Sequence, residues 1–181
     1  WTRIQCCLCI TRNYRMNLPQ WIITAVALQR LAELVLARRN TAGLIANGGI
    51  EFGAAHYPFI VAVHVGWLST LFFLTPTDAP VSVPLLAFFF LLQIGRVWVL
   101  FTLGARWTTR IIVLPNAPLV KHGLYRWFKH PNYLIVSAEI VILPFVFSQW
   151  QIALLFSFAN FFVLFWRIKV ENAALKKFSF D

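Results

Sequence analysis

Hydrophobic side chains fill five long runs of this chain, and short polar segments separate them. The runs cover residues 18–36, 57–75, 81–103, 133–147 and 150–166, of which the fourth is the shortest. A helix that crosses a membrane needs about 20 predominantly apolar residues. Only Ser148 and Gln149 separate the last two runs, which predicts a tight helical hairpin. The pattern therefore predicts an all-α integral membrane bundle of about five transmembrane helices.

Composition narrows the class of protein further. Hydrophobic residues make up 60% of the chain and charged residues 12%, whereas soluble domains carry about a quarter charged residues. The 181 residues leave only short loops between five spans. We therefore expect one transmembrane domain over residues 16–181 and no separate soluble domain.

The first fifteen residues differ from the rest. They lack the apolar core and the small-residue cleavage site of a signal peptide, and the only methionine, Met16, directly follows them. We interpret residues 1–15 as a non-native or disordered segment. Cys6, Cys7 and Cys9 lie in it without a neighbouring histidine. This is an incomplete zinc site, so we expect no metal site.

Basic residues are distributed unevenly between the two sides of the predicted bundle. The N-terminal side carries Arg3, Arg12 and Arg15. The other side carries eleven: Arg38, Arg39, Arg106, Arg110, Lys121, Arg126, Lys129, Arg167, Lys169, Lys176 and Lys177. Basic loops favour the cytosol, which predicts an external N-terminus and a cytosolic C-terminus. Anionic membrane lipid accounts for the net charge of +10, so we expect lipid contact and no nucleic-acid partner.

Four charged residues interrupt the apolar runs: Arg30, Glu33, Arg96 and Glu139. Each would cost roughly 2.5 to 3.5 kcal/mol at the centre of a bilayer, so we expect them to face protein. Arg30 can pair with Glu33 one turn away, and Arg96 can pair with Glu139 across two helices. Two interpretations remain open, namely structural pairing or a polar cavity lined by Arg96 or Glu139. We expect His64 to be an interhelical hydrogen-bond partner rather than a ligand.

Residues 104–133 are too polar to span a membrane and unusually rich in aromatic side chains. Gly123 permits a backbone geometry that other residues adopt only with strain. Pro131 suits the first position of the fourth helix, which places His130 at its N-terminus. Free N–H groups and the helix dipole favour an anionic ligand at such an end.

A cation and a carboxylate follow the last apolar run on the same side of the membrane. Arg167 and Glu171 are four residues apart, so they lie on one face of a helix. The sequence therefore predicts that they converge with residues 104–133 on one cytosolic pocket.

These motifs resemble the isoprenylcysteine carboxyl methyltransferase family of membrane methyltransferases. The likeness covers nearly all of residues 16–177, and within the family it is greatest to a bacterial branch of alkylpyrone O-methyltransferases. It is carried by Leu103-Gly104, Trp107-Thr108-Thr109, Ile112-Val113-Leu114-Pro115, Leu119-Val120, Gly123, Tyr125, His130-Pro131-Asn132-Tyr133, Arg167 and Glu171, and for that branch by Glu51-Phe52-Gly53 and His56-Tyr57-Pro58-Phe59.

The resemblance implies methyl transfer from S-adenosylmethionine to a lipophilic acceptor at the inner membrane of a bacterium. It implies that Arg167 acts on the acceptor side, with His130 and Lys129 beside it. It also implies a set of cofactor-binding residues: Pro118, Leu119, Val120, Tyr125, His130, Pro131, Asn132, Tyr133 and Glu171.

The sequence departs from the family pattern at three positions. Lys129 replaces the usual arginine, Asn172 replaces a second acidic residue, and Ala117 replaces a histidine found in the eukaryotic enzymes. Lysine is a point charge rather than a bidentate fork. A catalytically weakened homologue therefore stays open as an alternative. A non-enzymatic transporter subunit, in which the intramembrane charges form the pathway, is the other alternative.

The chemistry of the acceptor also stays open. A carboxylate needs mainly a cation such as Arg167 to orient it. A long-chain polyketide or alkylpyrone hydroxyl needs a general base, for which His130 or Glu171 are candidates.

Overall fold

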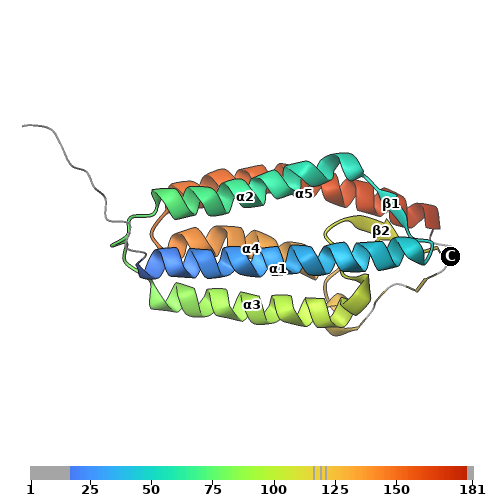
Figure 1. Cartoon of the computed structure of the whole chain (residues 1–181), viewed down its shortest axis with the longest axis horizontal. Coiled ribbons are helices and arrows are strands. Elements are labelled where there is room, and N and C mark those ends of the chain that lie inside the picture. The colour runs from blue at the N-terminus through green and yellow to red at the C-terminus, as the bar shows by residue number, and fades with distance from the viewer. Residues whose placement is uncertain (1–16, 116, 119, 121, 179–181) are drawn as a thin grey trace, which may run out of the picture.

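Five α-helices lie side by side along the long axis of the computed structural model (Figure 1). The structure describes residues 17–178 except 116, 119 and 121, so the interpretation of residues 1–15 lies outside the described residues. The helices are α1 (Leu18–Ala46), α2 (Tyr57–Leu74), α3 (Val83–Leu103), α4 (Pro131–Val146) and α5 (Trp150–Phe178).

Three helices match their predicted runs closely, and two are much longer. α2, α3 and α4 begin and end within two residues of the predicted bounds. α1 continues from the expected end at Leu36 to Ala46, and α5 continues from Trp166 to Phe178. Each has 29 residues, which is about 43 Å at 1.5 Å per residue. Since the hydrocarbon core is about 30 Å thick, both helices extend beyond it at the same end of the bundle.

α4 is the shortest helix and the most enclosed. Four helices of the described chain are long and apolar enough to cross a membrane, and α4, with 16 residues, is shorter. It packs against both α3 and α5. Its residues Ile140, Leu143 and Val146 are fully buried in a core that also contains Trp67 and Phe89. α4 is therefore an internal element that packs between α3 and α5.

The predicted hairpin between α4 and α5 is confirmed. The backbone N–H of Gln149 donates to the carbonyl of Pro144 at 2.9 Å. Ser148 has a φ of +58°, a left-handed conformation that allows the chain to reverse within three residues.

A small antiparallel ribbon, which the sequence analysis did not predict, closes the end where α1 and α5 extend. β1 (Ile50–Phe52) pairs with β2 (Ile111–Val113), and Glu51 lies opposite Ile112. Three short 3-10 helices flank the ribbon and α4: η1 (Ala54–His56), η2 (Gly104–Arg106) and η3 (Gly123–Arg126). This end of the bundle therefore holds most of the irregular backbone.

The four intramembrane charges form one closed set, which we call the sealed network. Glu33 accepts from Arg30 at 2.8 Å and from the Nε of Arg96 at 2.6 Å. Glu139 accepts from Arg30 at 2.6 Å and from Arg96 at 3.3 Å. The expected Arg30–Glu33 and Arg96–Glu139 pairs are both present, although Arg96 lies closer to Glu33. Each carboxylate contacts both arginines, which favours structural pairing.

The expectation for His64 is wrong. Its Nδ1 lies 2.8 Å from the carbonyl oxygen of Ile60, one turn earlier on the same helix. A helix side chain reaches its own preceding turn more easily than a neighbouring helix, so His64 bonds within α2.

Candidate functional site

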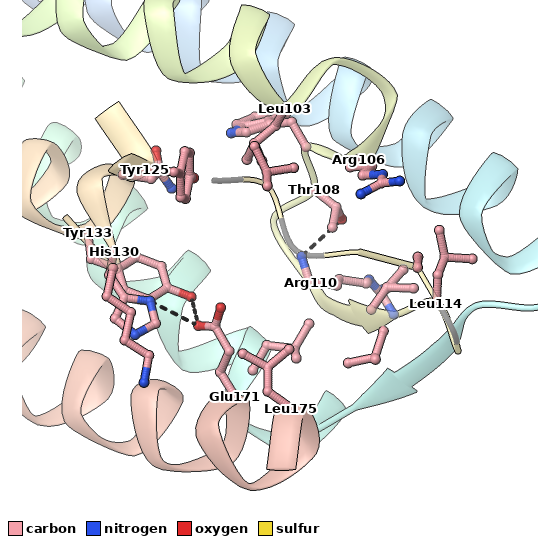
Figure 2. Close-up of a pocket in the computed structure, with 18 of the residues that line it drawn as sticks. Leu103, Arg106, Thr108, Arg110, Leu114, Tyr125, His130, Tyr133, Glu171 and Leu175 are labelled. Atoms are coloured by element: carbon pink, nitrogen blue, oxygen red, sulfur yellow. Dashed lines mark hydrogen bonds and ion pairs between the residues drawn. The ribbon is translucent and has the colours of Figure 1, made fainter. Parts of the chain in front are cut away.

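A cavity of about 630 Å³ lies at the end of the bundle that carries the ribbon. Figure 2 shows it between Tyr125, His130, Tyr133 and Glu171 on one side and Thr108, Arg110 and Leu114 on the other. Such a volume suits a small-molecule ligand. Its walls come from the segment between α3 and β2, the segment between η3 and α4, and the extended part of α5.

Local backbone geometry places the segment before α4. Gly123 has a φ of +60°, and a Cβ on it would lie 2.8 Å from Oγ1 of Thr102. The positive φ confirms the predicted backbone geometry, and glycine also lets η3 pack directly against α3. Pro131 is the first residue of α4 and His130 its N-cap. The fixed φ of proline starts the helix here and turns His130 toward the cavity wall.

The hydroxyl of Tyr133 joins two charged residues of α5. It donates to Glu171 Oε2 at 2.5 Å and accepts from Arg167 Nε at 2.8 Å. Arg167 also donates from Nη1 to the carbonyl of Thr109 at 2.8 Å. The His130 ring stacks on Tyr133 at 5.1 Å, with Nδ1 3.7 Å from Glu171 Oε2. We call His130, Tyr133, Arg167 and Glu171 the pocket cluster.

Burial sets the protonation of two aromatic groups here. It raises the pKa of Tyr125 to about 12, and the charge of Glu171 acts in the same direction. Burial lowers the pKa of His130, Lys129 lowers it as well, and Glu171 opposes both. At neutral pH Tyr125 is therefore a hydroxyl donor, and His130 is neutral with one ring nitrogen able to accept a proton.

Three buried polar atoms of cavity-wall residues have no hydrogen-bond partner among the residues that the structure describes. They are Nε1 of Trp107, Nε2 of His130 and Oδ1 of Asn132. Buried polar groups are nearly always hydrogen-bonded. A bound ligand or water would complete their hydrogen bonds.

The opposite wall is cationic. Arg106 donates to the carbonyl of Pro118 at 2.7 Å. Arg110 donates to Glu51 at 2.8 Å, and its guanidinium lies 4.9 Å from the centre of the Tyr57 ring. These contacts tie the loop after η2 to the β1 strand and to the start of α2.

Most of the expected site residues come together. The cavity wall includes Pro118, Val120, Tyr125, Lys129, His130, Asn132, Tyr133, Arg167 and Glu171. Leu119 lies outside the described residues. Pro131 does not line the cavity, since it is buried at the start of α4 and acts on the backbone instead. Lys129 lies on the wall and is exposed.

The sequence analysis gave no site role to several wall residues, among them Arg106, Thr108 and Arg110. Thr108 was part of a motif that carried the family resemblance, but no role was given to it. The two arginines were counted only as positive charges. The available signal was that both arginines directly flank the Trp107-Thr108-Thr109 motif that carried the family resemblance.

Comparisons with known proteins agree with this arrangement. The model of the isoprenylcysteine carboxyl methyltransferase family matches residues 85–177. The uncharacterized protein YpbQ of Bacillus subtilis (strain 168) is 38% identical over 164 residues, which cover 88% of this chain and 98% of that protein. An uncharacterized protein of Haemophilus influenzae is 24% identical over 156 residues, covering 81% and 88%. No solved structure matches. The chain therefore belongs to the isoprenylcysteine carboxyl methyltransferase family and is a membrane methyltransferase.

Proposed function

We propose that this protein transfers a methyl group from S-adenosylmethionine to an acidic oxygen of a lipophilic acceptor at the cytosolic membrane face. One observation carries the proposal. The Tyr133 hydroxyl holds Arg167 and Glu171 together at the wall of a cavity of about 630 Å³. A cation and a carboxylate are thereby fixed a short distance apart in a site of ligand size.

The lining fits the methyl donor. S-adenosylmethionine supplies an electrophilic methyl group on a positively charged sulfur. The carboxylate of Glu171 would bind the amino group of the donor, and Tyr125, Pro118 and Val120 would line its adenosine. The orphan atoms of His130 and Asn132 would find partners in a ligand with many polar groups.

The charge of the lining favours an acceptor that carries a negative charge. Among the described lining residues Glu171 is the one carboxylate, against five cations, of which only Arg110 forms an ion pair with a carboxylate outside the lining, that of Glu51: Arg106, Arg110, Arg126, Lys129 and Arg167. Nearby cations lower the pKa of a bound acid. A carboxylate or an acidic enolic hydroxyl therefore binds in its ionised form, already able to act as a nucleophile.

Two residues then have distinct roles toward the acceptor. Arg167 is held through Nε and Nη1, so its charge orients the acceptor oxygen. Orientation and fixed charge can supply much of the acceleration of a displacement reaction. His130, neutral at neutral pH, can accept the proton of an acceptor that arrives as a hydroxyl.

Surface charge supports a cytosolic cavity. Exposed basic residues gather at the cavity end: Arg38, Arg39, Arg126, Lys129, Lys169, Lys176 and Lys177. At the opposite end the described part of the chain carries only Asp78. By the positive-inside rule, this distribution supports a cavity on the cytosolic side.

The two alternatives gain no support from the contacts. In the sealed network each charge is paired within the protein, and none of its four residues lines the described cavity. It therefore makes a poor transport pathway. Tyr133, Arg167 and Glu171 are bonded to one another without any contribution from Lys129, which argues against a weakened active site.

A transfer assay tests the proposal. Membranes from cells that produce the protein are given S-adenosylmethionine with a radiolabelled methyl group and, separately, a long-chain 4-hydroxy-2-pyrone or N-acetyl-S-farnesylcysteine. We expect label in the extracted pyrone or cysteine derivative, and loss of transfer in Glu171→Gln but not in Lys176→Gln. Transfer to neither compound, or equal transfer by wild type and Glu171→Gln, would refute the proposal.

A further inference from the structure

One face of α1, in the part that continues beyond the predicted transmembrane run, packs against the cavity wall. Ala37, Asn40, Thr41 and Leu44 follow one another on this face at the spacing of a helix. Ala37 is completely buried in one cluster with Trp107, and Leu44 lines the cavity. The polar side chains of Asn40 and Thr41 therefore face the wall from between two apolar contacts.

These two polar side chains bind residues 104–110, which we call the wall loop. The side-chain amide of Asn40 donates to the carbonyl of Trp107 at 2.8 Å. The hydroxyl of Thr41 lies 2.7 Å from the hydroxyl of Thr108, so the two form a hydrogen bond. Hydrogen bonds depend on angle as well as on distance, and α1 therefore fixes both the position and the orientation of the wall loop.

Thr108 passes this constraint to a single peptide group. Its Oγ1 accepts from the backbone N–H of Arg110 at 3.1 Å (Figure 2). That N–H belongs to the peptide bond between Thr109 and Arg110, and the carbonyl of the same peptide bond accepts from Arg167 Nη1 at 2.8 Å. Because a peptide group is planar, the direction of its N–H determines the direction of its carbonyl.

A continuous series of hydrogen bonds therefore runs from α1 to the pocket cluster. It leads from Thr41 through Thr108 and this peptide group to Arg167, whose Nε donates to the Tyr133 hydroxyl at 2.8 Å. Hydrogen bonds in such a series polarise and strengthen one another. The guanidinium of Arg167 is thus held on one side by α4 and on the other side, through the wall loop, by α1.

We propose that Thr41 is a positioning residue for Arg167, although it does not itself line the described cavity. Its hydroxyl fixes the peptide group that holds the guanidinium, while Asn40 prevents the wall loop from shifting along α1. This inference rests on the proposed function, because it takes Arg167 to orient the acceptor. It also gives a role in the reaction to the part of α1 that extends beyond the membrane.

The first experiment tests the link without an assay of activity. Hydrogen exchange of the purified protein in detergent is followed by mass spectrometry in a peptide that covers residues 107–113. We expect faster exchange in Thr41→Val, because the bond that protects the Arg110 N–H loses its support, and wild-type exchange in Thr41→Ser, which keeps the hydroxyl. Thr24→Val is the matched control, since Thr24 lies on the same helix and does not line the cavity. Equal exchange in Thr41→Val and wild type would overturn the proposal.

The second experiment measures whether Thr41 acts through Arg167. Methyl transfer to the acceptor that wild type uses is compared for wild type, Thr41→Val, Arg167→Lys and the double variant. We expect kcat/KM for the acceptor to fall about 3- to 10-fold in Thr41→Val, as the loss of one hydrogen bond predicts, with the KM for S-adenosylmethionine and the unfolding temperature unchanged. In the background of Arg167→Lys the same change should have little further effect, whereas the losses of independent sites multiply.

The outcomes separate the two proposals. Multiplying losses, or a wild-type kcat/KM in Thr41→Val, would overturn the positioning role while the proposed function stands. If wild type methylates neither the pyrone nor N-acetyl-S-farnesylcysteine, the proposed function fails, and hydrogen exchange in Arg167→Lys decides the rest. Faster exchange of residues 107–113 in this variant as well as in Thr41→Val would show that both side chains hold one peptide group. Unchanged exchange in Arg167→Lys would show that they do not.

Discussion

The sealed network and the pocket cluster both contain arginine and glutamate, but these charges are paired in different ways. In the sealed network two arginines and two glutamates contact one another directly, and the Glu139 side chain is only 1% exposed. In the pocket cluster the Tyr133 hydroxyl stands between Arg167 and Glu171, and the Glu171 side chain is 24% exposed. The first set leaves no charge for a ligand, while the second leaves a carboxylate accessible from the cavity.

The difference assigns the two sets to different tasks. Charges that are buried and matched within the protein fix how α1, α3 and α4 fit together. Charged side chains that are partly exposed, and that lie beside polar atoms without a hydrogen-bond partner such as His130 Nε2, can bind a ligand. Substitutions in the sealed network should therefore change stability, and substitutions in the pocket cluster should change activity.

The largest effect is expected for Glu139→Leu. The change leaves Arg30 and Arg96 to share Glu33, and an uncompensated buried charge costs about 3 to 5 kcal/mol. Thermal unfolding of the purified protein in detergent measures this loss. The double variant Arg30→Met/Glu139→Leu, which restores neutrality, should recover most of the stability. Equal stability of wild type and Glu139→Leu would show that the sealed network does not stabilise the packing of α1, α3 and α4.

A smaller effect, on activity, is expected for Arg167→Lys. Lysine keeps the charge but cannot bond to Tyr133 and to the Thr109 carbonyl with a planar fork. Losing hydrogen bonds to a charged group costs about 1.5 to 3 kcal/mol, so kcat/KM should fall about 10- to 100-fold. The reverse exchange at an exposed site of the same helix, Lys169→Arg, should leave kcat/KM unchanged. If Arg167→Lys keeps the wild-type kcat/KM, Arg167 does not orient the acceptor.

Tyr133→Phe is expected to have a more modest effect. The ring still stacks on His130, but Arg167 and Glu171 lose the hydroxyl between them. We expect the KM for S-adenosylmethionine to rise about tenfold, which corresponds to about 1.4 kcal/mol, with little change in unfolding temperature. Tyr57→Phe is the control, because Tyr57 also bonds through its hydroxyl but does not line the cavity. A loss of stability without a change in KM would show that Tyr133 has a structural role, as the residues of the sealed network do.

The smallest effect concerns pH. Burial lowers the pKa of His130 in the folded protein, whereas the unfolded chain binds this proton near pH 6.5. Between about pH 6.5 and the lower folded value the unfolded state holds more protons, so stability falls as pH decreases. Unfolding of wild type and His130→Gln at a series of pH values should show a steeper acid loss in wild type. Parallel curves would mean that His130 is protonated equally in both states.

Much of the bundle was predictable because the thickness of the membrane sets the length of the apolar run that each spanning helix needs. The bounds of α2, α3 and α4 followed from hydropathy alone. The ends of α1 and α5 did not, because hydrophobicity stops at the membrane surface while helix propensity continues through alanine, leucine, lysine and arginine. The ribbon was missed for a related reason, since strands of three residues gain their stability from pairing across the chain.

The site was predictable on one wall and not on the other. Motif spacing brought His130, Tyr133, Arg167 and Glu171 together, as expected. It could not show that Tyr133 bridges the two α5 residues, because that depends on how α4 and α5 face each other. Nor could it show Arg106 and Arg110 on the far wall, since their placement depends on the ribbon.

Binding of S-adenosylmethionine is the most direct measurement of the account. Purified protein in detergent is titrated with the radiolabelled donor, together with Glu171→Gln, Tyr125→Ala and the exposed control Lys176→Gln. The account predicts saturable binding by wild type and Lys176→Gln and at least about tenfold weaker binding by the two cavity variants. Absence of saturable binding, or binding that neither cavity variant changes, would contradict it.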